Sequence, residues 1–150
     1  MAKISSFILC DNVQQQFVQG NGVVGNVIFN LINPLQVLSP YTIPGSFSFS
    51  FSIGLSDFDT TIQNTLCIKF RDPFEKIVTE LSDVPLPPMP KDVVTLPLEY
   101  RSIRFNADIR NALIEHSGLY SMLVIFNNEA IGEFSIPAYP LLDRVQGAKK

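Results

Sequence analysis

The side chains that most often carry chemistry are scarce in this chain of 150 residues, which has one histidine, His116, and two cysteines, Cys10 and Cys67. The residues beside His116 supply no nucleophile, base and orienting group in sequence. Both cysteines lie within predicted strands, whereas reactive thiols favour exposed, electropositive surroundings. The sequence therefore predicts no catalytic residue and no enzyme. A small hydrolase with an unrecognised carboxylate or Cys/His site stays open as an alternative.

Carboxylates form the next candidate site. Asp57 and Asp59 lie in one turn-rich loop, and Asp72 and Glu75 lie in the following hairpin. Hard cations such as Ca²⁺ prefer oxygen ligands, and loops at one end of a sandwich can converge. A C2-like domain that binds calcium and lipid is thus the first alternative, and the hydrolase is the second. The simpler interpretation is that Asp favours turns through hydrogen bonds to nearby backbone. The cysteine and histidine spacing favours no zinc site, and we predict no metal and no cofactor.

Charge and hydropathy exclude two classes of partner. The net charge is −3, only 17% of the residues are charged, and no basic stripe is present, so we expect no nucleic-acid binding. No run of 18 apolar residues occurs, and we expect no membrane span. The apolar run 4–10 is too short for a signal peptide. We therefore expect a cytoplasmic protein with free thiols.

The fold is predicted by the segment 46–53, where Ser and large apolar residues alternate without a break. A β-strand places residues i and i+2 on one face, so Phe47, Phe49, Phe51 and Ile53 line one side and four serines the other. One face then packs on a core, and the other meets water or a thin polar cover.

The rest of the chain predicts short strands joined by turns. Only 106–117 has helical spacing, with Asn106 as cap, Ile109, Ala112 and Leu113 as the apolar stripe and His116 at the C-terminal end. The other predicted strands are 4–11, 23–31, 66–71, 77–81, 93–100, 119–126 and 131–136, with Gln14 to Gln16 in a connection. The fold class is all-β, a two-layer antiparallel β-sandwich, in one domain over 1–142 with a loose tail over 143–150. An up-and-down barrel is the alternative architecture.

Three segments carry a family resemblance. These are the opening 4–11, the segment 22–29, and the hairpin from Gly118 through Asn127 and Asn128 to Glu133. They resemble a family of small, functionally uncharacterised bacterial domains. The resemblance implies a β-sandwich, immunoglobulin-like or C2-like, from a bacterium or phage, and it supplies no catalytic residue. Tyr120 stands where such sandwiches place a corner tyrosine that hydrogen-bonds to backbone just upstream.

These observations predict a non-enzymatic binding or structural module that acts through loops or a sheet face. The partner is a protein or a second copy, because the uncharged serine face of 46–53 favours homo-oligomers. Bulky or acidic residues on loops are the candidate contacts. They are Tyr41, Asp57, Phe58, Asp59, Leu86 and Met89.

Overall fold

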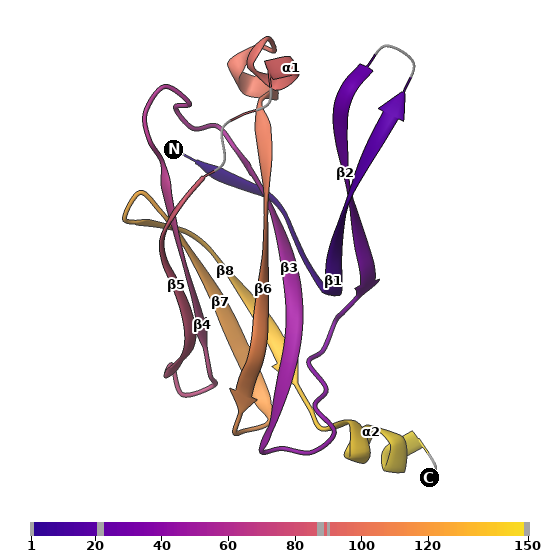
Figure 1. Cartoon of the computed structure of the whole chain (residues 1–150). Helices are drawn as coiled ribbons and strands as arrows, with labels where there is room; N and C mark the ends of the chain where they lie inside the picture. The colour runs from indigo at the N-terminus through magenta and orange to yellow at the C-terminus, as the bar shows by residue number, and fades with distance from the viewer. Residues whose placement is uncertain (1, 21–22, 87–88, 90, 149–150) are drawn as a thin grey trace.

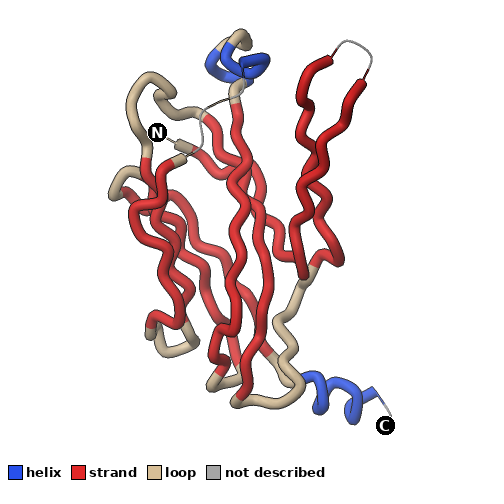
Figure 2. The backbone as a smooth tube through the Cα atoms, viewed as in Figure 1, coloured by secondary structure: helices blue, strands red, loops and turns tan. Residues whose placement is uncertain are grey.

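The computed structural model describes residues 2–20, 23–86, 89 and 91–148. The described chain forms two antiparallel sheets of four strands, in the orders β2-β1-β3-β6 and β5-β4-β7-β8 (Figures 1 and 2). The strands are β1 (Lys3–Gly20), β2 (Val23–Pro34), β3 (Gly45–Ser56), β4 (Thr65–Arg71), β5 (Ile77–Pro85), β6 (Ser102–Ile114), β7 (Gly118–Phe126) and β8 (Glu129–Ala138). The predicted all-β sandwich is confirmed.

The core lies between the two sheets, and β3 lines it as the alternation predicts. Phe49, Phe51, Ile53 and Leu55 have no exposed surface. Leu66, Ile68 and Phe70 of β4 and alternate residues of β7 face them from the other sheet. Aromatic rings pack across the two sheets, since the ring centroids of Phe49 in β3 and Phe70 in β4 lie 5.5 Å apart. Within the second sheet, the Phe70 ring contacts the Tyr120 ring edge-on at 5.3 Å.

The serine face of β3 has the polar cover that the sequence allowed. Ser50 and Ser52 are fully buried. The Ser50 hydroxyl donates to the carboxylate of Asp108, and Arg104 donates to the Ser52 hydroxyl at 2.9 Å. Side chains of β6 thus lie over this part of the face, so Ser50 and Ser52 are not available to a second copy.

The predicted helix over 106–117 is wrong, because these residues belong to β6 and the turn after it. Ile103, Phe105 and Ile109 keep the two-residue period of a strand. Between Ile109 and Ala112 the register with β3 shifts, and Asn111 takes a left-handed conformation with φ of 54°. This β-bulge inserts an extra residue, so the buried positions become three apart and imitate helical spacing.

Three further expectations differ from the structure. Residues 93–100, predicted as a strand, contain the end of helix α1 (Lys91–Val94) and the 3₁₀ turn η1 (Leu98–Tyr100), with Pro97 between them. The segment expected to be a loose tail is helical within α2 (Leu141–Ala148), and residues 149–150 lie outside the described part. Gln14 to Gln16 lie within β1 rather than in a connection.

The first strand continues past the sandwich as a ribbon. β3 pairs with β1 only as far as Cys10, opposite Ser50, and beyond that point β1 pairs with β2. After β2 the chain returns to the sandwich, where Leu38 bridges to Ala138 of β8 in parallel. The ribbon of β1 and β2 thus lies, along the chain, between the part of β1 that pairs with β3 and the segment that contacts β8 (Figure 1).

Candidate functional site

The loop end, as we call the end of the sandwich near α1, brings together residues from three distant segments. The loop between β3 and β4 supplies Asp57, Phe58 and Asp59. A hollow of about 770 Å³ is lined there by Lys3, Asp57, Phe58, Asp59, Thr60, Thr61, Leu98, Glu99 and Arg101. The lining combines three carboxylates, two cations and two large apolar side chains.

Phe58 anchors this loop to the core. Its ring is half-buried and lies 5.3 Å from the ring of Phe126, at the end of β7. Asp57, beside it, has a left-handed backbone with φ of 58° and pairs with the ammonium of Lys3 at 3.2 Å. The exposure of both partners means that this ion pair positions the loop more than it stabilises the fold.

Asp59 organises the tip of the same loop. One carboxylate oxygen accepts hydrogen bonds from the Thr61 hydroxyl at 2.6 Å and the Thr61 amide at 2.9 Å. Both hydrogen bonds lower the pKa of Asp59, and the bond from the Thr61 hydroxyl has the larger effect. The buried Asn64 amide donates to the Asp59 carbonyl at 2.9 Å and accepts from Asn127 at 2.9 Å. The β3–β4 loop is therefore tied to the β7–β8 turn.

Five of the six predicted contact residues gather at the loop end. Leu86 and Met89 line a smaller hollow of about 120 Å³ together with Phe58, Ile62 and Ile103. Phe58 is thus shared between the two hollows. Tyr41 lies at the other end, where its carbonyl accepts the amide of Leu142 at the start of α2. Residues 87, 88 and 90 of the proline run lie outside the described residues.

The four acidic residues of the calcium hypothesis do not come together. Asp57 and Asp59 precede β4, whereas Asp72 and Glu75 follow it. Seven strand residues separate the two loops by about 20 Å. Within the described ranges, no three His, Cys, Asp or Glu residues lie close enough to hold a metal ion.

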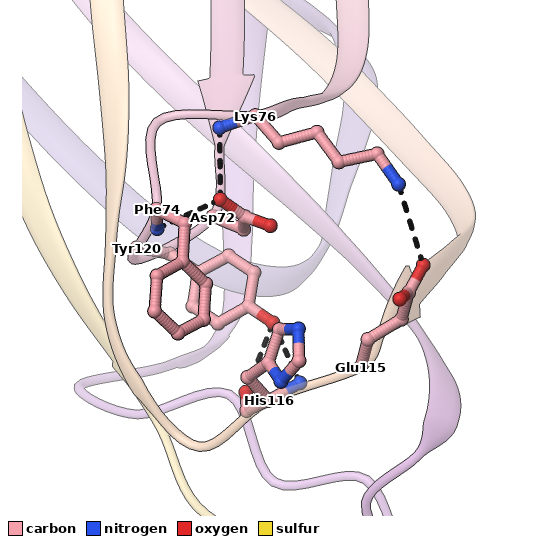
Figure 3. A network of polar contacts seen from close by, with 6 residues as sticks. All are labelled: Asp72, Phe74, Lys76, Glu115, His116 and Tyr120. Carbon is pink, nitrogen blue, oxygen red and sulfur yellow. Dashed lines mark hydrogen bonds and ion pairs between the residues drawn. The ribbon is translucent and has the colours of Figure 1, made fainter.

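Asp72 has a structural role in its turn (Figure 3). It is largely buried, and one carboxylate oxygen accepts the amides of Phe74 and Lys76, each at 2.8 Å. Glu75 has φ of 67°, and its amide donates to the Asp72 carbonyl at 3.0 Å. For both Asp59 and Asp72, backbone capping accounts for an acidic residue at that position.

His116 and Tyr120 lie beside this turn (Figure 3). The Tyr120 hydroxyl donates to the His116 carbonyl at 2.9 Å and accepts its amide at 3.4 Å, which confirms the expected corner hydrogen bond. The His116 ring meets Phe74 edge-on at 4.9 Å. His116 therefore does not end a helix, as was expected, but packs in the turn between β6 and β7.

The two thiols are both free and lie in different sheets. Burial is the main cause that raises the pKa of each. Cys10 has no exposed surface, and the Cys67 thiol donates to Glu80 at 3.6 Å. A raised pKa lowers the thiolate fraction that nucleophilic chemistry requires.

Sequence reasoning missed Lys3, Leu98, Glu99 and Arg101. Leu98 and Glu99 fell in the predicted strand 93–100, but they lie in η1 and line the hollow together with Arg101, which follows η1. Arg101 is held by a hydrogen bond from its Nε to the Leu96 carbonyl at 2.8 Å. Pro97 was the available signal, because a proline in this position favours a break in the strand.

Comparison with protein-family models and with curated protein sequences finds no match. Among solved structures, an immunoglobulin-like protein from Pseudomonas aeruginosa is similar at 11% sequence identity and a TM-score of 0.43. The match covers 93% of this chain and 97% of that one. The resemblance to a family of uncharacterised bacterial domains stays a prediction. None of the helices in the described part of the chain has the length and apolar character needed to cross a bilayer.

The strand order itself defines the class. When β2 is left out, β1, β3 and β6 form one sheet, and β4, β5, β7 and β8 form the other. In the lettering of the immunoglobulin fold, the first sheet corresponds to strands A, B and E, and the second to strands C, F and G with β5 added beside strand C. Tyr120 makes its corner bond on β7, which corresponds to strand F. The chain is an immunoglobulin-like β-sandwich module.

Proposed function

We propose that this chain is a non-enzymatic binding module that holds a segment of a partner protein at the loop end. The observation that carries the proposal is the 770 Å³ hollow, because its lining mixes charge of both signs with Phe58 and Leu98. Apolar anchors within a polar rim are typical of protein interfaces. The site residues are Asp57, Phe58, Asp59, Leu86 and Met89, extended by Leu98 and Arg101.

The charges indicate the chemistry of the partner. Carboxylates outnumber cations in the lining, and Lys3 is already paired with Asp57. Glu99 and Asp59 are both exposed residues of this lining. A segment with an apolar side chain next to Lys or Arg complements this surface. The free thiols support a reducing, cytoplasmic setting. The family resemblance favours a bacterial or phage source, and in this proposal 1–142 act as one domain.

A library of random peptides displayed on phage, selected on the immobilised full chain, tests the proposal. We expect selected peptides to carry an aromatic or aliphatic residue beside a basic one. In calorimetric titrations of the synthetic peptide, Leu98→Lys should weaken binding at least about tenfold. Leu98 is 55% exposed, so the substitution does not disturb the core.

The matched control is Leu119→Lys, which alters a leucine of similar exposure, 64%, at the opposite end of the sandwich. We expect unchanged peptide affinity for this variant and for Tyr41→Lys. A phage selection that enriches no peptide would contradict a site at the loop end. Peptides that bind Leu98→Lys as tightly as the unmodified protein would contradict it as well. Weaker binding by Tyr41→Lys alone would move the site to the end near α2.

A further inference from the structure

The arm is a part of the fold that the sandwich does not use. We define it as residues 11–20 of β1 and 23–34 of β2, which pair with each other from Asn12 opposite Ile32 to Gly20 opposite Val23. β1 is the only element with which β2 has extensive contacts among the described strands. The two strands stand away from the sheets as a separate ribbon (Figure 2).

An isolated pair of strands is marginally stable in water, because it has neither a third strand nor a covering layer. The arm also leaves apolar surface exposed: Phe29 is 38% exposed and Ile32 is 40% exposed. The sandwich provides no further strand for β2, which forms the outer edge of its sheet. The arm thus has the properties of an element that is completed by another chain.

Charge distinguishes this edge from the others. Residues 12–56 contain no Asp, Glu, Lys, Arg or His, so β2 has no ionisable side chain. Charged residues on an edge strand discourage pairing with another chain. The other three edge strands of the described sheets all carry them: Glu80 and Asp83 on β5, Arg104, Asp108 and Arg110 on β6, and Glu129 and Glu133 on β8.

Backbone geometry adds to this contrast. Asp83 in β5 and Asn111 in β6 have left-handed conformations at register shifts, with φ of 52° and 54°. Such bulges interrupt the row of backbone groups to which a new strand would bond. The edge of β8 is partly covered by the bridge to Leu38. In the arm, pairing runs without a register shift from Asn12 to Val18; its shift lies between Val18 and Gly20, and its left-handed residue, Asn33 with φ of 52°, lies at the end of β2 next to the sandwich.

We infer that two copies of this chain associate by pairing the β2 edges of their arms in antiparallel fashion about a twofold axis. The resulting sheet runs β1-β2-β2-β1 across the two arms. We take the partner of β2 to be a second copy of this chain. Two copies each carry a net charge of −3, but their β2 strands are uncharged and can pair without like-charge repulsion. An isologous contact also closes, so assembly stops at the dimer.

Sedimentation equilibrium of the full chain, from low to high micromolar concentration, measures the mass directly. We expect a mass approaching twice the 16.7 kDa of the chain. Hydrogen exchange followed by mass spectrometry should show protection of residues 23–34 that increases with concentration. A mass that stays at one chain at the highest concentration overturns the inference.

The variants Ile32→Lys and Phe29→Lys place a charge on the β2 edge at exposed positions. Each should raise the dimer dissociation constant at least about tenfold, because twofold pairing brings two added lysines into the same short interface. The matched control is Ile77→Lys, an isoleucine of similar exposure on the edge strand β5. It should leave the dimer intact.

A third variant replaces residues 12–32 by two glycines, which keeps the bond from the Leu35 amide to the Leu9 carbonyl. This protein should be monomeric with a β-type circular-dichroism spectrum. A dimer that survives this deletion, or that Ile77→Lys disrupts while Ile32→Lys does not, contradicts pairing through the arm. The lysine variants decide the question even where the deletion variant does not fold. Peptide binding at the loop end is measured separately, so each proposal can fail alone.

Discussion

The corner tyrosine offers the sharpest test of the fold. Tyr120 is 1% exposed, and its hydroxyl makes two hydrogen bonds with the backbone of His116. The substitution Tyr120→Phe removes both bonds and leaves the ring, with its edge contact to Phe70, in place. The change therefore isolates the contribution of the hydroxyl.

The expected loss is about 1–1.5 kcal/mol, because the bond at 2.9 Å is well formed and the one at 3.4 Å is weak. His116 is exposed as a residue, so we expect water to reach its backbone in the variant and the larger cost of an unsatisfied buried group not to apply. In urea, this loss lowers the unfolding midpoint by about 0.5 M for a slope of about 2–3 kcal/mol/M.

Urea unfolding followed by far-ultraviolet circular dichroism measures this difference. The control is Tyr139→Phe, since Tyr139 is 47% exposed and we expect no measurable change. Free energies of unfolding that agree within about 0.3 kcal/mol for the two variants would show that the corner bond does not support the fold.

The same hydroxyl predicts a dependence on pH. Burial is the main cause that raises the pKa of Tyr120 above its ordinary value of 10.0. The folded protein holds this proton more tightly than the unfolded chain, so stability falls as the pH rises from 10.0 toward the folded pKa. Tyr120→Phe lacks this titration. Its deficit should therefore shrink at alkaline pH, and a constant deficit would contradict the predicted shift.

Three other predictions concern the turn, the thiols and the core. Asp72→Ala should cost about 1–3 kcal/mol in urea unfolding because two backbone amides lose their acceptor, whereas Asp72→Asn should recover most of it; equal losses would refute the capping role. In native protein at pH 8, iodoacetamide should modify the half-buried Cys67 slowly and Cys10 only after unfolding, as read by mass spectrometry; rapid labelling of Cys10 would refute its burial. Phe51→Ala should cost about 3–5 kcal/mol in thermal or urea unfolding, while Phe74→Ala, at a ring that is 71% exposed, should cost less than about 1 kcal/mol; similar losses would contradict the assigned core.

The loop end could be predicted only in part. The residue types of Asp57, Phe58 and Asp59 marked one loop as a candidate, because bulky and acidic side chains on a loop suggest binding. Leu98 and Glu99 were missed because the segment 93–100 was predicted as a strand, and Arg101 directly follows that segment. Their place at the hollow depends on the short turn η1 and on the Arg101 bond to Leu96. Pro97 indicated a break in the strand, but it did not indicate the turn that follows.

What the sequence determined by itself is local and periodic. The alternation of Phe and Ser established the inner face of β3, because the two-residue period of a strand requires no knowledge of its neighbours. Tyr120, at the start of a strand after Gly118, was enough to predict the corner bond. Only the tertiary structure decided that 106–114 is a strand, because its bulge at Asn111 is defined by pairing with β3, more than fifty residues away in the chain. It also decided that the acidic loops lie at opposite ends and that β2 leaves the sandwich as an arm, since both depend on where distant strands pair.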